Sequence, residues 1–330
     1  MEEQVLKTIT KYNLIQSGDK IVLAVSGGPD SIFMLDILDK LKENLNFQIV
    51  VCHVNHMIRK EATDDEAYVQ SFCKKRGIEC YIKRIDVKKI AHNKKIGTEE
   101  AGRMVRYEFF EEILKETNSN KIAIAHNKND KSETVIMNLL RGTGMLGLRG
   151  IEAKRDEKFI RPIIETKRKD IEEYCAQNKL EPRIDKTNFE NIYTRNKIRN
   201  IVIPYIEKEF NPNIIDGISR LSDIATEEDN FLSNYTSNKY EELLIEESSN
   251  KVILDLKLFN KQDKVIKKRL ILYTITKLMG SSKGIEKVHI EDIIKLCKNN
   301  IGNKFLTPNK NIKILVKNSK IFLERKPNLP

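Results

Sequence analysis

A short glycine turn near the N-terminus sets the strictest limit on how this chain folds. Residues 21–25 (IVLAV) are apolar and rich in β-branched side chains, and the hexapeptide Ser26–Ser31 (SGGPDS) follows them directly. Apolar residues then recur at helical spacing, at Ile32, Leu35 and Leu38. This order predicts a buried strand that passes through a tight turn into a helix.

The same alternation continues over the first 165 residues. Short apolar runs, which are typical of buried parallel strands, occur at 21–25, 48–54, 80–85 and 121–125. Segments with apolar residues at helical spacing occur between them, at 31–41, 62–76 and 98–116. This order predicts an α/β fold with a doubly wound, mostly parallel sheet, in which ligands bind beyond the carboxyl ends of the strands.

The second half of the chain has a different pattern. Helical spacing continues over 216–244, and the polar stretch 246–251 (EESSNK) predicts a loop. Two predicted helices and three predicted strands follow, at 261–279, 288–298, 304–307, 312–316 and 321–324. Because 330 residues exceed the usual size of one hydrophobic core, we expect more than one domain. The predicted parts are an α/β domain at 1–212, a helical connector at 213–250 and a small α+β domain at 251–330.

Composition and charge exclude several classes of protein. Mean hydropathy is −0.47, and no apolar run approaches the roughly 18 residues that span a bilayer, so we expect no membrane segment. The start, MEEQVLK, has no apolar signal region, which favours a cytoplasmic location. The five cysteines form no C-x-x-C pair, so neither a disulfide framework nor a cysteine metal site is indicated. The net charge of +11 suggests a polyanionic partner.

The glycine turn has the chemistry of a phosphate site. Two glycines allow backbone N–H groups to converge, and the following helix adds positive partial charge. The ordinary alternative is a strand–turn–helix connection in which Asp30 or Ser31 caps the helix. The turn lacks the lysine of a Walker A loop. It is similar instead to the SGG-x-DS turn of the PP-loop, or N-type ATP pyrophosphatase, family, whose members cleave ATP to AMP and pyrophosphate.

Further motifs resemble those of bacterial tRNA(Ile)-lysidine synthases, in the same order over almost the whole chain. They are 53–59 (HVNHMIR), 99–107 (EEAGRMVRY), 125–134 (AHNKNDKSET), 140–148 (LRGTGMLGL), Arg161 with Pro162, Asp185 with Asn188, and 195–199 (RNKIR). The resemblance implies an enzyme that joins free L-lysine to C2 of the wobble cytidine in the CAU anticodon of tRNA(Ile). ATP, with Mg²⁺, would activate the cytidine as an adenylate, releasing pyrophosphate and then AMP.

The resemblance also implies roles for residues of these motifs. ATP is expected to contact Ser26, Gly27, Gly28, Pro29, Asp30, Ser31, His53, His56 and His126, with Asp30 also near Mg²⁺. Lysine is expected to contact Asp130, Glu133, Arg195 and Arg199, and the expected catalytic residues are Asp30, Asp130 and Glu133. Contacts with tRNA or phosphate are expected from Arg103, Arg106, Arg141, Lys267, Lys268, Arg269 and the basic run 167–169.

The residue types alone leave alternatives open. Asp130 and Glu133 are three residues apart, so both carboxylates project from one helix face, but acids are favoured at any helix N-terminus. The three histidines could contact a nucleotide, hold a metal or make structural hydrogen bonds. The arginines could fork onto phosphate or carboxylate, or could be solvated charges on helices.

Two features depart from the family pattern. Where the family has paired aspartates, this chain has Asn129 before Asp130, so Asp130 carries more of any role that needs negative charge. Longer members have a further C-terminal domain, whereas five residues follow Arg325 here. The alternative functions are another PP-loop ligase, which would modify tRNA differently or form an amide, and a tRNA-binding protein without activity. The sequence does not give the oligomeric state, and a homodimer is left open.

Overall fold

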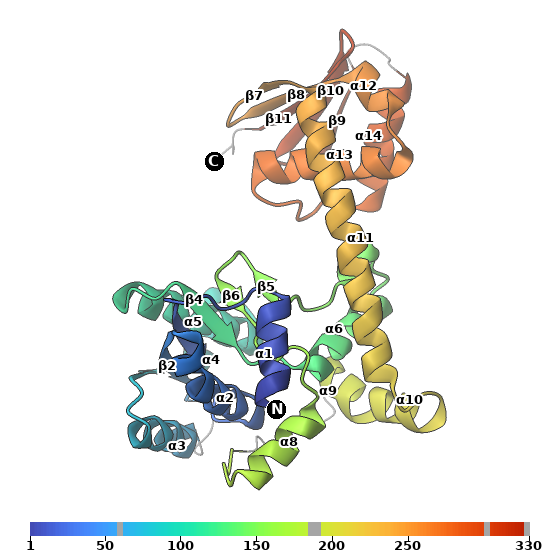
Figure 1. Cartoon of the computed structure of the whole chain (residues 1–330). Helices are drawn as coiled ribbons and strands as arrows, with labels where there is room; N and C mark the ends of the chain where they lie inside the picture. The colour runs from blue at the N-terminus through green and yellow to red at the C-terminus, as the bar shows by residue number, and fades with distance from the viewer. Residues whose placement is uncertain (58–61, 184–192, 300–303, 327–330) are drawn as a thin grey trace. The chain divides into compact units, whose positions relative to one another are not determined.

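The computed structural model describes residues 1–57, 62–183, 193–299 and 304–326 (Figure 1). The chain forms two compact units, residues 1–225 and 226–330, each with its own hydrophobic core. None of the helices in the described residues combines the length and the apolar character that a bilayer-spanning segment needs.

A six-stranded sheet forms the centre of the N-terminal unit, with the strand order β3-β2-β1-β4-β6-β5. Its strands are β1 (Lys20–Ala24), β2 (Gln48–Asn55), β3 (Cys80–Arg84), β4 (Lys121–Ile124), β5 (Lys154–Arg155) and β6 (Phe159–Ile160). Neighbours pair in parallel except for β5, which is antiparallel to β6. The predicted fold class, a doubly wound and mostly parallel sheet, is confirmed.

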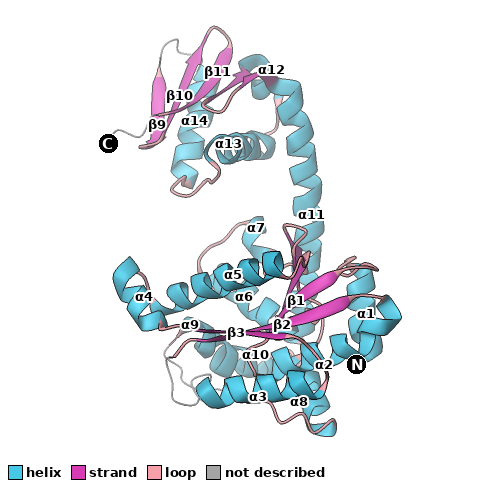
Figure 2. Ribbon diagram, turned by 90° about the vertical axis from the view of Figure 1, so that its left-hand side faces the viewer, coloured by secondary structure: helices cyan, strands magenta, loops and turns pink. Residues whose placement is uncertain are grey.

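Helices cover both faces of this sheet (Figures 1 and 2). They are α1 (Glu2–Lys11), α2 (Pro29–Leu45), α3 (Ala62–Lys75), α4 (Val87–Lys94), α5 (Thr98–Glu116), α6 (Lys128–Leu140), α7 (Met145–Leu148) and α8 (Arg168–Gln177). In β1, Ile21 and Leu23 pack with α1, α2 and α8, whereas Val22 packs on the other face with α5. Because both faces are covered, the strands read as continuous apolar runs rather than alternating ones.

A run of helical segments completes the N-terminal unit. It consists of α9 (Thr194–Lys197), a π-helical turn (Ile198–Val202), α10 (Ile203–Glu209) and α11 (Ile214–Leu243), which continues into the second unit. Ile198, Ile203 and Ile215 pack against Ile136 of α6. This small apolar cluster holds the start of the run against α6.

The C-terminal unit is an antiparallel sheet with three helices. Its sheet has the order β7-β8-β11-β10-β9, with β7 (Leu244–Glu247), β8 (Lys251–Asp255), β9 (Phe305–Asn309), β10 (Ile312–Lys317) and β11 (Lys320–Arg325). The helices are α12 (Leu256–Lys261), α13 (Lys264–Met279) and α14 (Lys287–Asn299). Strand residues such as Ile314 and Leu323 pack with helix residues such as Leu270 and Ile293.

One stretch differs from the prediction. Residues 246–251 were expected to form a loop, but Glu246 and Glu247 end β7, and Lys251 begins β8, with which β7 pairs in an antiparallel hairpin. β7 lies at the edge of the sheet and its side chains are mostly exposed. An exposed edge strand tolerates charged side chains, so its sequence resembles that of a loop.

Candidate active site

The glycine turn lies between β1 and α2, as predicted. Gly27 has a φ of +92°, a left-handed conformation that favours glycine. The hydroxyl oxygen of Ser31 accepts hydrogen bonds from the N–H groups of Ser26 (3.2 Å) and Gly27 (3.1 Å), and the hydroxyl donates to the carbonyl oxygen of Gly28 (2.9 Å). Ser31, in the first turn of α2, therefore holds the glycine turn in shape.

The N-terminus of α2 provides the remaining backbone donors. Pro29, at the first helical position, has no N–H group to satisfy. Among the described residues, no acceptor is hydrogen-bonded to the N–H groups of Asp30 and Ser31. These two groups, together with the positive end of the helix dipole, can hold the oxygens of a phosphate.

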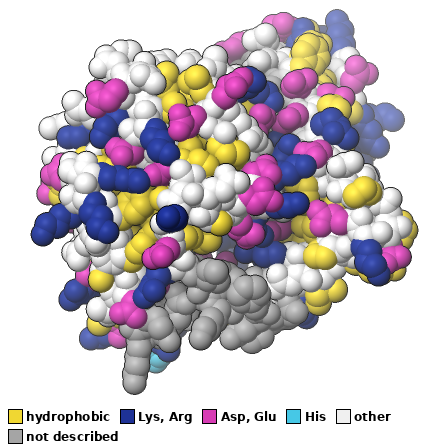
Figure 3. All heavy atoms as spheres, turned by 60° about the horizontal axis from the view of Figure 1, so that its bottom comes forward, with side chains coloured by type: hydrophobic (Ala, Val, Ile, Leu, Met, Phe, Trp, Pro, Cys, Tyr) yellow, Lys and Arg dark blue, Asp and Glu magenta, His cyan; other side chains and the backbone are white. Residues whose placement is uncertain are grey.

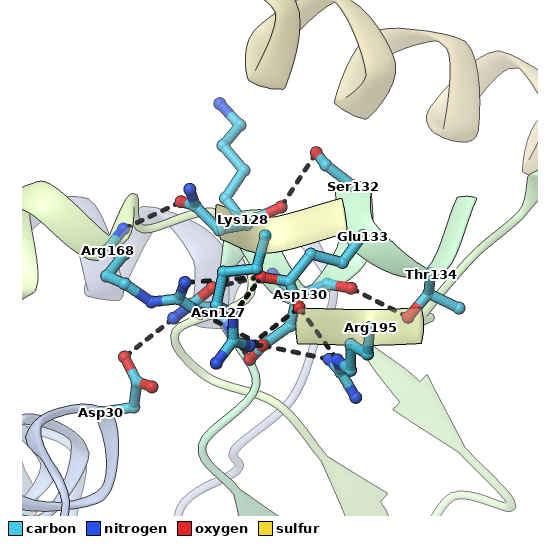
Figure 4. A network of polar contacts seen from close by, with 11 residues as sticks. Asp30, Asn127, Lys128, Asp130, Ser132, Glu133, Thr134, Arg168 and Arg195 are labelled. Carbon is cyan, nitrogen blue, oxygen red and sulfur yellow. Dashed lines mark hydrogen bonds and ion pairs between the residues drawn. The ribbon is translucent and has the colours of Figure 1, made fainter. Parts of the chain in front are cut away.

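An equivalent junction follows β4, where Asn127 caps α6. The side-chain oxygen of Asn127 accepts a hydrogen bond from the N–H of Asp130 (2.9 Å), and the Asp130 carboxylate accepts one from the N–H of Asn127 (3.1 Å). The side-chain amide of Asn127 also donates to Asp30 (2.8 Å; Figure 4). One fully buried side chain thus joins the N-termini of α2 and α6.

Three arginines converge on Asp130 and Glu133, and two of them, Arg168 and Arg195, are labelled in Figure 4. Arg195 donates to Glu133 (2.9 Å) and Asp130 (3.1 Å), and Arg199 donates to Glu133 (2.6 and 2.8 Å) and Asp130 (3.0 Å). Arg168 makes a longer contact of 3.4 Å with each carboxylate. Only 7% of Asp130 and 0% of Glu133 are exposed. Three guanidinium groups therefore surround two buried carboxylates, which leaves one excess positive charge.

The members of this cluster come from separate parts of the chain. Asp130 and Glu133 project from one face of α6, as their three-residue spacing predicts. Arg195 lies in α9 and Arg199 in the π-helical turn, so their four-residue spacing also brings them to one side. Arg168 is the first residue of α8. π-helical turns are frequent at functional sites, and here the turn carries Arg199 to both acids.

The two aspartates have pKa values that are shifted in opposite directions. Burial, together with the negative charge of Asp130, raises the pKa of Asp30 to about 6. Burial would also raise the pKa of Asp130. The positive charges of the surrounding arginines, with a contribution from His126, outweigh burial and lower the pKa of Asp130. Near neutral pH, Asp130 is firmly ionised, whereas Asp30 lies closer to its titration range.

Of the three predicted histidines, His53 lies within β2 near its end, and His56 and His126 follow β2 and β4. The Nδ1 of His53 donates to the carbonyl oxygen of Val25 (2.9 Å), which ties β2 to the start of the glycine turn. The Nε2 of His53 and the Nδ1 of His56 are buried, and neither has a hydrogen-bond partner among the described residues. Arg161 donates to the Nδ1 of His126 (3.0 Å). Burial lowers the pKa values of His56 and His126 to about 4, so both rings are neutral at pH 7.

Three of the arginines predicted to contact tRNA or phosphate lie in the N-terminal unit. Arg103 stacks on the ring of Tyr107, with 4.7 Å between the guanidinium carbon and the ring centre. Arg106 donates to the carbonyl oxygen of Gly102 (3.3 Å), one turn back on α5. Arg141 follows the last residue of α6 and is exposed. These arginines lie outside the cluster around Asp130 and Glu133.

The other three predicted cations lie on α13 in the C-terminal unit. Lys267 donates to the carbonyl oxygen of Asn260 (2.8 Å), and the Nζ of Lys268 lies 3.9 Å from the Oε1 of Glu291. Arg269 forms an ion pair with the buried Asp229. On the face of the molecule in Figure 3, lysine and arginine side chains are interspersed with aspartate and glutamate. On that face, the net positive charge is not gathered into one patch.

Two central side chains, Asn127 and Arg168, were not predicted as members of the site. The signal for Asn127 is its position three residues before Asp130, which is the spacing of a capping box. Arg168 was grouped with its basic neighbours as an RNA contact, and no local pattern indicates that it contacts acids on another helix. The side-chain oxygen of Asn129 accepts a hydrogen bond from the N–H of Arg168 (3.0 Å). The motif residues Ile58, Arg59, Asp185 and Asn188 lie outside the described residues.

The described residues offer few acidic ligands for a metal ion. In the described part of the chain, no group of three or more His, Cys, Asp or Glu side chains is arranged to hold a metal, and all five cysteines are free. Asp30 lies at the glycine turn, where its carboxylate contacts the Asn127 amide. A single carboxylate beside a phosphate site fits Mg²⁺, which takes most of its ligands from phosphate and water.

The chain is similar to known proteins over most of its length. Residues 1–206 match the PP-loop domain family. The tRNA(Ile)-lysidine synthase of Clostridium acetobutylicum is 48% identical over 94% of this chain and 67% of its own length. The synthase of Clostridioides difficile is 44% identical over 97% of this chain and 70% of its own length.

Among solved structures, the U34-tRNA thiolase NcsA from Methanococcus maripaludis, with its [4Fe-4S] cluster, has a TM-score of 0.58. It is 21% identical, and the alignment covers 68% of this chain and 78% of the thiolase, so this likeness shows the fold alone. The similarity to the two synthases is more specific, because it extends beyond residue 206 and through both units. The chain belongs to the tRNA(Ile)-lysidine synthase family, and its N-terminal part is a PP-loop domain.

Proposed function

We propose that this enzyme uses ATP to attach L-lysine to C2 of the wobble cytidine in the CAU anticodon of tRNA(Ile). The observation that carries the proposal is the Asn127 bridge, which joins the phosphate-binding turn to the cluster around Asp130 and Glu133. The turn suits the triphosphate and the cluster suits an amino acid. A site that joins lysine to an ATP-activated base requires both next to each other.

In the first step, the cytidine O2 attacks the α-phosphate of ATP and pyrophosphate leaves. Residues Ser26–Ser31 hold the phosphate oxygens, with the free N–H groups at the start of α2 as donors. His53, His56 and His126 lie at the ends of the neighbouring strands and contact the nucleotide. Asp30 would hold Mg²⁺ at this turn. When bound, the ion supplies positive charge for the leaving pyrophosphate.

In the second step, the ε-amine of lysine attacks C2 and AMP leaves. Asp130 and Glu133 already accept hydrogen bonds from three arginines, so they have little capacity left for an ammonium group. Free lysine carries both a negative carboxylate and positive ammonium groups. Its carboxylate can form an ion pair with Arg195 or Arg199 in place of the protein carboxylates. Its ε-ammonium can then bind Asp130 and Glu133 where that arginine was bound. The carboxylate and the ε-ammonium together add no net charge to the cluster, and the α-ammonium adds one positive charge.

Proton removal from lysine is the main energetic demand of this step. From a reference pKa of about 10.4, neutralising the amine at pH 7 costs roughly 4.6 kcal/mol. Asp130 and Glu133 are the carboxylates that face the amine in this arrangement, and one of them receives the proton as the C–N bond forms. Glu133 has no exposed surface, so its side of the site excludes water. Excluding water there limits hydrolysis of the activated base at C2 in place of lysine attack.

The remaining assignments concern the tRNA. We propose that residues 1–212 form the catalytic domain, that 213–250 connect it to the rest, and that 251–330 form a small tRNA-binding domain. Arg103, Arg106 and Arg141 would contact the RNA near the site, and Lys267, Lys268 and Arg269 would contact it from α13. With free tRNA and lysine as substrates, the reaction belongs in the cytoplasm.

Incubation of unmodified tRNA(Ile) with the protein, ATP, Mg²⁺ and labelled lysine tests the proposal. Mass spectrometry of the wobble nucleoside should show lysidine, with one AMP and one pyrophosphate formed for each lysine incorporated. Without lysine, adenylated tRNA should accumulate. Formation of AMP without incorporation of lysine would show that another acceptor replaces it, and the absence of any adenylate would favour a binding protein.

A further inference from the structure

The sheet of the C-terminal unit has one covered face and one open face. Side chains of Ile312, Ile314 and Val316 on β10, with Ile321 and Leu323 on β11, belong to the core that packs with α12, α13 and α14. The alternate residues of the same strands point to the opposite face. The helices of this unit gather on one side of the sheet (Figure 2).

A row of apolar side chains crosses the open face. The strand register places Phe305 of β9 beside Leu315 of β10, Leu315 beside Phe322 of β11, and Phe322 beside Ile253 of β8. These four residues are not part of the core that packs with the helices of this unit. Ile253 is buried at one end of the row, whereas Phe305 is 58% exposed and Leu315 and Phe322 are partly exposed. The row therefore offers two aromatic rings to a ligand that lies on the sheet.

Three lysines and two acids border this row, with Lys313 opposite Glu324 on one side and Lys320 opposite Asp255 on the other. Lys317 and Lys320 face each other across the last pair of the β10–β11 hairpin, and Lys313 lies with its ammonium group 5.0 Å from the centre of the Phe305 ring. Like charges directly opposite each other destabilise a sheet. Asp255 of β8 lies opposite Lys320 in the strand register and offsets part of this repulsion, whereas Lys317 has no acid opposite it on β11. An anion placed between the two lysines would offset the rest.

We propose that this open face, formed by Phe305, Lys313, Leu315, Lys317, Lys320 and Phe322, binds the tRNA substrate. Phosphates of the RNA backbone lie between Lys317 and Lys320, and an unpaired base stacks on the Phe305 and Phe322 rings. Aromatic side chains on a sheet, bordered by cations, form a common platform for unpaired nucleotides. The inference rests on the proposed function, because tRNA is the polyanion on which that reaction acts.

Salt-dependent binding tests the phosphate contacts. The double variant Lys317→Gln/Lys320→Gln should bind unmodified tRNA(Ile) about fivefold or more weakly at 0.1 M salt. Because each phosphate contact contributes about 0.7 to 0.9 to the slope of log Kd against log salt concentration, the slope should fall by about 1.5. The matched control, Lys283→Gln/Lys287→Gln, removes the same charge near the start of α14 and should leave both quantities unchanged.

A second variant tests stacking without changing charge. Phe322→Leu keeps an apolar side chain in the row but removes a ring on which a base can stack, so binding should weaken about threefold or more with an unchanged salt slope. For both variants, the rate of lysidine formation at saturating tRNA should equal that of the wild type. A normal rate with a raised KM for tRNA separates this proposal from the proposed function.

Three results would overturn the proposal. The first is an unchanged Kd for tRNA in both variants. The second is an equal effect of the control pair, which would mean that net charge alone matters. The third is a change in oligomeric state on sedimentation, caused by the lysine or phenylalanine variant, with unchanged tRNA binding to the resulting species. That result would assign the face to contact between two copies of the chain.

Discussion

The junctions after β1 and β4 have the same architecture but opposite electrostatics. Each places an aspartate in the first turn of a helix, and Asn127 contacts both aspartates. Nevertheless, the pKa of Asp30 is raised to about 6, whereas that of Asp130 is lowered. The helix N-terminus favours an anion in both cases, so it cannot cause the difference.

The arginines around Asp130 cause the difference. Asp130 is contacted by Arg168, Arg195 and Arg199, whereas the neighbour that is hydrogen-bonded to Asp30 is the neutral Asn127 amide. Asp130 therefore holds cations that belong to the protein, and Asp30 is suited to a cation that arrives with the nucleotide. In the proposed reaction, the first junction would bind ATP and the second would bind lysine.

The largest expected effect is the loss of adenylation in Asp30→Asn. The substitution keeps the size of the side chain but removes the charge that faces the triphosphate. We expect the rate of tRNA adenylation to fall by about 1,000-fold, which corresponds to roughly 4 kcal/mol of transition-state stabilisation. The measurement is single-turnover formation of adenylated tRNA without lysine. A rate within tenfold of the wild type would remove Asp30 from the first step.

Glu133→Gln should act mainly on the second junction. Loss of one carboxylate leaves buried arginines with only Asp130, and breaking a buried ion pair in this way costs about 3–5 kcal/mol. Urea denaturation should show this loss of stability, and lysine transfer to pre-adenylated tRNA should slow by about 100-fold, equal to roughly 3 kcal/mol. Adenylation should stay within tenfold of the wild type.

Glu173→Gln is the matched control for Glu133→Gln, because Glu173 is an exposed glutamate on α8 whose partner is Lys169, 3.8 Å away. An exposed pair of this kind contributes at most about 1 kcal/mol, so neither stability nor lysine transfer should change appreciably. Equal losses of adenylation and lysine transfer in Glu133→Gln would contradict the separation of the two junctions.

The pH dependence of stability should have opposite signs at the two aspartates. The pKa of Asp30 is raised in the folded state, so the unfolded chain releases this proton first and the folded state loses stability as the pH rises from about 4 to 7. Asp30→Asn should therefore be more stable than the wild type at pH 7, by at most about 3 kcal/mol, and equally stable near pH 3.5.

Asp130→Asn should show the reverse pH dependence. The pKa of Asp130 is lowered in the folded state, so its stabilising contribution is complete above the unfolded value and is lost as the pH falls through the folded one. This variant should be less stable than the wild type at pH 7, with a difference that narrows in acid. Urea denaturation from about pH 2 to 7 measures both differences, because the change for Asp130 falls below about pH 4. Parallel pH profiles would contradict the assigned electrostatics.

Local patterns in the sequence predicted the first junction better than the second. The apolar run, glycine turn and helical spacing that specify β1 and α2 are contiguous, so they can be read directly. The spacing of Asp130 with Glu133 predicted that both carboxylates project from one helix face, and the family resemblance predicted that Arg195 and Arg199 belong to the same site. Their mutual contact depends on the packing of α6 against the π-helical turn, which no local pattern contains.

Arg168 and β7 show two further limits of sequence reasoning. Arg168 is 38 residues from Asp130 in the chain, and its basic neighbours made it look like a surface cation. The packing of α8 brings it to the acids. The exposed edge strand β7 carries glutamates and looks like a loop, because edge position, rather than side-chain hydrophobicity, decides its pairing.

The smallest expected effect concerns Asn129, the residue before Asp130. Its side-chain oxygen accepts a hydrogen bond from the N–H of Arg168 at the start of α8. Asn129→Asp keeps this acceptor and adds a negative charge at a helix N-terminus, which is worth about 0.3–1 kcal/mol, so thermal unfolding should shift slightly upward. Asn178→Asp, at the C-terminal end of α8, is the matched control and should be destabilising. The negative end of the helix dipole lies there, and the hydrogen bond that the Asn178 amide donates to the carbonyl oxygen of Tyr174 is lost. A lower unfolding temperature for Asn129→Asp would mean that repulsion from Asp30 and Asp130 outweighs the helix dipole at this position. The neutral Asn129 would then be what allows Asp30 to keep its raised pKa and Asp130 its lowered pKa.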